Sequence, residues 1–196
     1  MPVTIETISA DELARYFTVS SAFRVESVLE VEAIEGEDGG FRLTEVPLAE
    51  PYVKDYDALE PAGAARWRDW DLTYWRFLLA EESGRTVGAA AVAHRSPGIR
   101  LLEDRDDLAA LWDLRVAPSH RRRGIGARLF DEAAAYARAC GCTRLEVETQ
   151  HVNVPACAFY ASRGCRLGTV DRDAYREPEV RHEIMLLWHL DLRPRT

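Results

Sequence analysis

One segment constrains the fold more than any other: an apolar run from Leu108 to Val116, a short basic turn, and a helical pattern from Ile125 to Cys140. The apolar run is typical of a central strand, and Pro118 ends it. In the helical pattern, apolar residues recur at spacings of three and four, and Gly141 supplies the stop. A strand that leads directly into a crossover helix indicates an α/β fold built on a mixed sheet.

The turn between that strand and that helix has the composition of an anion site. It reads Ala117-Pro118-Ser119-His120-Arg121-Arg122-Arg123-Gly124-Ile125-Gly126. Its two glycines carry no Cβ that would keep backbone amides away from an oxyanion, and the amides lie at a positive helix N-terminus. Three arginines add charge-assisted hydrogen bonds. The turn therefore predicts a diphosphate site; the alternative is a solvated basic turn before an ordinary helix.

Two other phosphate-binding loops fit this turn less well. A Walker loop requires Gly-Lys-Ser/Thr at the helix start, whereas this helix starts Gly126-Ala127-Arg128. A dinucleotide fingerprint requires a third glycine, and Leu129 occupies that position.

Periodicity and turn residues predict the remaining elements. Ser9 to Glu12 has the pattern of a capping box and predicts a helix start. Pro47 to Ala65 has three prolines and is typical of a loop with a small helix near its end. Further strands are expected at 3–8, 24–34, 41–46, 74–80, 86–94, 144–149, 166–170 and 182–190, with a helix at 155–163.

Composition excludes several classes of protein. The formal charge of −8 disfavours nucleic-acid binding, which needs an excess of Lys and Arg. The N-terminus lacks the pattern of a secretory signal, and no apolar run is long enough for a membrane span, so the expected location is the cytoplasm. The four cysteines are not spaced as a zinc site and are expected to be reduced and mostly buried, so no metal is predicted.

Two motifs in order resemble those of the GNAT superfamily of N-acetyltransferases. Arg121-x-x-Gly124-x-Gly126 is similar to its acetyl-CoA motif. Asn153 to Ala156, then Phe159-Tyr160 and Gly164-Cys165, resemble its second signature, with Cys165 where phenylalanine is usual. The resemblance implies one domain over residues 1–196, with a mixed, mostly antiparallel sheet, a splayed parallel strand pair and flanking helices.

The resemblance also implies acetyl-CoA as co-substrate and assigns residues to it. Leu114, Arg115 and Val116 would pair their backbone with the pantetheine arm, and Asn153 would hydrogen-bond it. Tyr160 would lie beside the thioester sulfur as general acid; the alternative is a half-buried helix tyrosine. The diphosphate would be bound by Arg121, Arg122, Arg123, Gly124, Ile125, Gly126, Ala127 and Arg128.

A base must accept a proton from the attacking amine, and three carboxylates are candidates. Glu148 is the first, because several relatives carry a catalytic glutamate at the matching position. Asp113, within a largely apolar strand, is the second. Glu146 has the same side-chain parity as Glu148 but lies deeper along the strand. For each, the alternative is a hydrogen-bonded or substrate-orienting carboxylate.

Further features resemble the streptothricin (nourseothricin) acetyltransferases. They are Phe23-Arg24-Val25, the run from Gly40 to Pro47, Pro51, Lys54, the run from Glu148 to Cys157, and the pair Asp171 and Tyr175. The resemblance implies a small cationic amine as acceptor, which suits the acidic charge balance. Candidate pocket carboxylates are Glu45, Asp55, Asp57, Asp113, Glu148 and Asp171; the tryptophans at 67, 70, 75 and 112 are expected in the core or at its rim. The segment 58–71 departs from the group.

Alternatives stay open at this point. The acceptor could instead be a protein N-terminus, a polyamine or an aminoglycoside. A protein of another class, a binding module that senses acyl-CoA without catalysis, is also compatible with the motifs. An edge strand expected at 182–190 offers backbone pairing across a homodimer.

Overall fold

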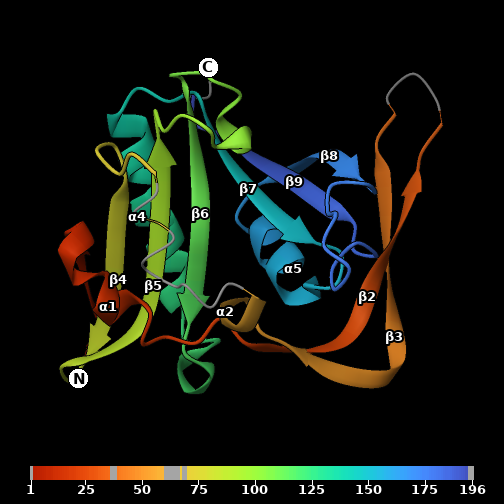
Figure 1. Cartoon of the computed structure of the whole chain (residues 1–196), viewed down its shortest axis with the longest axis horizontal. Coiled ribbons are helices and arrows are strands. Elements are labelled where there is room, and N and C mark those ends of the chain that lie inside the picture. Colours follow the sequence, from red (N-terminus) through yellow and green to blue (C-terminus); the bar gives the residue numbers. More distant parts are fainter. Residues whose placement is uncertain (1, 36–38, 60–66, 68–69, 194–196) are drawn as a thin grey trace. The chain divides into compact units, whose positions relative to one another are not determined.

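The computed structural model describes residues 2–35, 39–59, 67 and 70–193 (Figure 1). The strands are β1 (Thr4–Ile8), β2 (Phe23–Ala33), β3 (Phe41–Lys54), β4 (Arg76–Glu82), β5 (Arg85–His94), β6 (Leu108–Val116), β7 (Arg144–Gln150), β8 (Arg166–Asp171) and β9 (Met185–Asp191). The α-helices are α1 (Leu13–Tyr16), α2 (Tyr56–Leu59), α4 (Ile125–Ala139) and α5 (Val154–Ser162), and short 3-10 turns are η1 (Ala10–Glu12), η2 (Arg100–Leu102) and η3 (Pro118–His120).

The strands form a seven-stranded sheet in the order β1-β4-β5-β6-β7-β9-β8 and a two-stranded ribbon of β2 and β3. Neighbours β1–β4, β4–β5, β5–β6 and β8–β9 are antiparallel, and β6–β7 is parallel. The predicted α/β fold with a mixed, mostly antiparallel sheet is confirmed.

The chain divides into two compact units. Unit 1 comprises Met1–Ala22, Asp55–Val147 and Asp191–Thr196, and unit 2 comprises Phe23–Lys54 and Glu148–Leu190. The division passes through β7 between Val147 and Glu148.

The core of unit 1 is built by strands β4 to β6 and helix α4. Leu129 and Ala133 of α4 are fully buried on the face that the sequence predicts. Small residues on β5 let this helix approach closely, since a Cβ at Gly88 would lie only 3.0 Å from Ile125 Cγ2. As expected, the tryptophans belong to the core: Trp67 and Trp75 are buried, and Trp70 and Trp112 pack against them.

The register of β6 changes along its length. Its parallel pairing with β7 covers only Leu108 to Ala110. On its other side, Leu111 pairs with Val92 and Asp113 with Ala91, so Trp112 is an extra residue in a β-bulge. A bulge shifts which side chains share a face of the strand, a feature that simple alternation in the sequence does not predict.

The prediction of a loop from Pro47 was wrong for its first part. Strand β3 continues to Lys54 and contains both Pro47 and Pro51. Because β2 is the one strand that pairs with β3 in the described part of the chain, proline nitrogens are tolerated on the unpaired side of β3. The small helix is α2, and residues 60–66 and 68–69 of the 58–71 segment lie outside the described residues.

The prediction of an edge strand starting at His182 was also wrong. Strand β9 begins at Met185 and lies between β7 and β8, so it offers no edge for a dimer; the outer strands are β1 and β8. The residues before it have other partners, since the backbone amide of Ile184 donates to His151 Nδ1 at 3.0 Å and the Glu183 carboxylate pairs with the buried Lys54 ammonium.

Candidate active site

The basic turn in unit 1 forms an uncapped helix N-terminus. Arg122 and Gly124 both have left-handed backbone conformations, with φ of +62° and +80°. The turn therefore needs glycine at 124 because of its backbone angle, a conformation that costs glycine nothing. Among the described residues no side chain caps α4, and its first intrahelical hydrogen bond runs from Arg128 N to Gly124 O. The amide groups of Ile125, Gly126 and Ala127 precede that bond, which is the arrangement that binds oxyanions.

The three consecutive arginines of the turn have different surroundings. Arg121 donates to the carbonyls of Val116 at 3.0 Å and Ala22 at 2.9 Å, so it fastens the turn to the chain around it. Arg123 forms an ion pair with Glu82 at 2.6 Å, and the His120 ring lies 3.1 Å from the same carboxylate. Arg122 is exposed, and within the described parts of the chain no hydrogen bond or ion pair engages it. Arg122 is thus the arginine best placed to meet a ligand.

Arg128, the last residue predicted for the diphosphate, has an intramolecular partner as well. Its Nη1 donates to the carbonyl of Val3 at 2.8 Å. The guanidinium therefore connects the first turn of α4 to the segment before β1.

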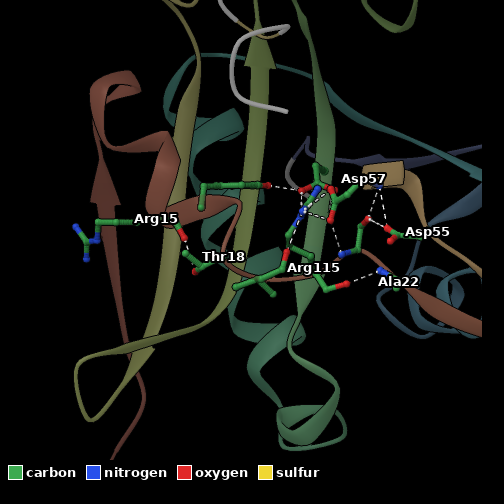
Figure 2. A network of polar contacts seen from close by, with 11 residues as sticks. Arg15, Thr18, Ala22, Asp55, Asp57 and Arg115 are labelled. Carbon is green, nitrogen blue, oxygen red and sulfur yellow. Dashed lines mark hydrogen bonds and ion pairs between the residues drawn. The ribbon is translucent and has the colours of Figure 1, made fainter. Parts of the chain in front are cut away.

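The Arg115 side chain lies at the centre of a polar network in unit 1 (Figure 2). Its guanidinium donates to Asp113 at 2.7 Å, to Asp57 at 3.0 Å and to the carbonyl of Val19 at 2.9 Å. Burial disfavours the charge of Arg115, but the two carboxylates outweigh that effect and raise its pKa. The Arg115 side chain is therefore committed to intramolecular partners.

The same network engages Asp113. Its Oδ2 accepts hydrogen bonds from Arg115 and from the hydroxyl of Tyr16 at 2.5 Å. The Asp113 side chain is 21% exposed, and these two bonds hold it against the buried guanidinium and the phenol. The geometry thus favours the alternative reading of Asp113, a carboxylate that holds structure.

Asp57, predicted as a pocket carboxylate, is the second acid of this network. The backbone amide of Ser21 donates to it at 3.0 Å. Burial tends to raise the pKa of Asp57, but that amide and Arg115 together lower it. Asp55, beside it, accepts from the Ser21 hydroxyl at 3.2 Å. Asp55 and Asp57 therefore join the segment before β2 to the start of α2.

Glu146 lies in the core of unit 1. Its side chain is 2% exposed and pairs through Oε1 with Arg144. Burial raises its pKa, and its Oε2 is buried without a hydrogen-bond partner in the described structure. A carboxylate in this position is not reachable by a substrate amine.

Unit 2 contains the remaining candidates. Glu148 is half-buried and accepts a hydrogen bond from the hydroxyl of Tyr175 at 2.8 Å. Asn153 is the N-cap of α5, where its Oδ1 accepts from the amide of Ala156 at 3.3 Å. Tyr160 is 6% exposed, so it is more deeply buried than the half-buried helix tyrosine of the alternative reading.

Two features of these sites were not predicted from the sequence. The Arg115 network was missed, although Asp113 and Arg115 stand two residues apart on one strand, the spacing of same-face neighbours. The contact between Tyr175 and Glu148 joins residues 27 positions apart, and no local pattern reveals it.

Other kinds of site find little support in the described residues. No group of three or more His, Cys, Asp or Glu side chains there is arranged to hold a metal ion. No helix in the described part of the chain is long and apolar enough to cross a membrane. Cys142, Cys157 and Cys165 are buried and Cys140 partly so, as expected. A cavity of about 270 Å³ is lined by Arg95, Ser96, Pro97, Leu102, Asp104, Arg105 and Asp106, none of which is a candidate residue.

Comparison with known proteins agrees with the motifs. The sequence model of the Acetyltransferase (GNAT) family matches residues 42–165. The chain is 32% identical to the streptothricin acetyltransferase of Streptomyces lavendulae over 75% of its own length and 82% of that protein's. It is 28% identical to streptothricin acetyltransferase A of Bacillus subtilis (strain 168), over 78% and 81% of the two chains.

Solved structures have the same fold. The crystal structure of nourseothricin acetyltransferase superposes with a TM-score of 0.76 at 24% identity, covering 98% of this chain and all of that one. A putative streptothricin acetyltransferase from Bacillus anthracis str. Ames, in complex with acetyl coenzyme A, also gives 0.76 at 20% identity, covering 97% and 99% of the two chains. Fold and enzyme class are thus as the motifs predicted, and the chain belongs to the acetyltransferase (GNAT) family.

Proposed function

We propose that this enzyme transfers the acetyl group of acetyl-CoA to a primary amine of a streptothricin-like antibiotic. The observation that carries the proposal is the similarity to streptothricin acetyltransferases, at 27–32% identity over 75–93% of this chain. A match to the GNAT family alone does not define the acceptor. These three relatives are all named as streptothricin acetyltransferases, which favours an acceptor of that class.

Charge supports a cationic acceptor. Residues 23–54, which form β2, β3 and their connection, carry eight acidic and three basic side chains, and the whole chain has a formal charge of −8. An acidic surface attracts a polycationic substrate and raises its rate of encounter with the enzyme.

The uncapped start of α4 is the proposed diphosphate site. The amides of Ile125, Gly126 and Ala127, with the exposed guanidinium of Arg122, supply donors of the kind that a diphosphate needs. Arg121 and Arg123 hold the shape of the turn through their own intramolecular partners.

Glu148 and Tyr160 are the proposed base and acid. As the amine nitrogen attacks the thioester carbonyl carbon, Glu148 accepts the proton that the nitrogen releases, directly or through water. The C–N bond forms and the C–S bond breaks, and the Tyr160 hydroxyl protonates the departing thiolate. Glu148 is preferred to Asp113 and Glu146 because each of those two carboxylates forms an ion pair with an arginine. Asp113 pairs with the buried Arg115, and the buried Glu146 pairs with Arg144.

A panel of acceptors tests the proposal. Thiol release from acetyl-CoA is measured with streptothricin, spermidine, an aminoglycoside and a ribosomal-protein N-terminal peptide at equal concentrations. We expect the highest kcat/KM with streptothricin. Faster turnover of any other acceptor refutes the substrate assignment, and acetyl-CoA binding in calorimetry without turnover of any amine favours the acyl-CoA sensor.

A further inference from the structure

Strand β7 presents two polar side chains on one face at its carboxyl end. Glu148 and Gln150 are two residues apart and are both half-buried, whereas Thr149 between them is buried on the opposite face. Thr149 Oγ1 accepts a hydrogen bond from the indole N–H of Trp188 at 2.9 Å. This anchor fixes which face of the strand Glu148 and Gln150 occupy.

The hydroxyl of Tyr175 lies between these two side chains. It is 2.8 Å from Glu148 Oε1 and 2.9 Å from Gln150 Nε2. An ionised carboxylate can only accept, so the one hydroxyl proton points to Glu148. The hydroxyl oxygen must then accept from the Gln150 amide. The chain of donors therefore has one direction, from Gln150 through Tyr175 to Glu148.

The segment that carries Tyr175 is anchored on both sides. Before it, Arg172 donates to the carbonyl of Val31 at 2.6 Å. After it, the Glu183 carboxylate forms a buried ion pair with Lys54, whose side chain is 6% exposed. A residue on a connection between strands is usually free to move, but these anchors hold the phenol against β7.

We propose that Tyr175 is a positioning residue for acetyl transfer: its hydroxyl, supported by Gln150, fixes the rotamer of Glu148 and so sets the direction in which that carboxylate points. The proposal rests on the proposed function in one respect, the assignment of Glu148 as the base. A hydrogen bond to the charged form of an acid favours that form. A base whose rotamer is already fixed also loses less conformational entropy when the amine binds.

A titration that does not depend on turnover tests the contact itself. The side-chain carboxyl ¹³C signal of Glu148 is assigned by its loss in Glu148→Gln and is followed through pH in the wild-type enzyme and in Tyr175→Phe. We expect the midpoint to move up by about one pH unit in Tyr175→Phe, since one donor to the carboxylate is removed. A midpoint that stays in place overturns the proposal.

Kinetics test the role in catalysis. On streptothricin, Tyr175→Phe should lower kcat about tenfold while the KM for acetyl-CoA stays within about twofold. In the Glu148→Gln background the same substitution should have no further effect, because it acts through Glu148. Tyr74→Phe is the matched control: this tyrosine is 45% exposed in unit 1, and its loss should leave kcat unchanged. A tenfold loss that persists without Glu148 refutes a positioning role.

The outcomes separate the two proposals. If the wild-type enzyme acetylates no streptothricin but the titration midpoint still moves, the substrate assignment fails and the ordering of Glu148 by Tyr175 stands. If Glu148→Gln retains full activity on streptothricin, the base assignment fails, and the catalytic role of Tyr175 is overturned with it.

Discussion

Replacing Arg115 by methionine tests the buried network of unit 1. The substitution keeps an apolar side chain of similar length but leaves Asp113, Asp57 and the Val19 carbonyl without their shared donor. The Arg115 side chain is 6% exposed, and the two carboxylates are 21% and 35% exposed. Removal of one partner from a buried ion pair typically costs about 3–5 kcal/mol.

The lower end of that range applies here, because both carboxylates can regain some water and Asp113 keeps the Tyr16 hydroxyl. We therefore expect Arg115→Met to lose about 3 kcal/mol of unfolding free energy and to melt about 6–12 °C lower. Urea unfolding followed by tryptophan fluorescence reports mainly on unit 1, which contains four of the five tryptophans.

Arg105→Met is the matched control. Arg105 also makes two hydrogen bonds to one carboxylate, Asp107, at 2.9 and 2.8 Å, but both side chains are more than 40% exposed. Exposed pairs of this kind contribute little, so the control should unfold close to the wild type. Equal losses of unfolding free energy in the two variants would refute the expectation that burial makes the Arg115 network more stabilising than an exposed ion pair.

Four further outcomes are expected. Gly124→Glu should abolish acetyl-CoA binding in calorimetry, because it puts a carboxylate at the start of α4 and a side chain at φ +80°; wild-type affinity would remove this turn from the site. Arg122→Ala should raise the KM for acetyl-CoA about tenfold and Arg123→Ala only about twofold in initial-rate measurements, and the reverse order would contradict the assignment of Arg122. Tyr160→Phe should lower kcat more than it weakens acetyl-CoA binding, and an unchanged rate would exclude it as the acid. Hydrogen bonds from Arg105 and from the Thr143 hydroxyl lower the pKa of Asp107 to about 2, below its unfolded value of about 3.9. The small stabilisation that these exposed bonds give is therefore present above about pH 4 and is lost as the pH falls toward 2, so thermal melts of Asp107→Asn should show a slightly shallower loss over that interval.

Local patterns in the sequence predicted most of the secondary structure. Strand β6 occupies the predicted residues 108–116, and the buried face of α4 is the one that its three- and four-residue spacing indicates. These features depend on neighbours a few residues apart, so the chain specifies them locally. The prolines of β3 led to a wrong prediction of a loop. The free-energy cost of a proline in a strand depends on whether that strand has a partner on one side or on both, which the local sequence does not reveal.

The sequence also determined the family. Its two motifs, the basic glycine turn after a strand and the later Asn153 and Tyr160, are local and can be recognised without the tertiary structure. The tertiary structure decided which charged groups are committed to the protein. Arg115 meets Asp57 across 58 positions, and Tyr175 meets Glu148 across 27. Such contacts follow from strand order and from the anchoring of distant segments, which no local period encodes. For that reason the sequence named three candidate bases, and only the fold shows that two of them pair with arginines, Asp113 with Arg115 and Glu146 with Arg144.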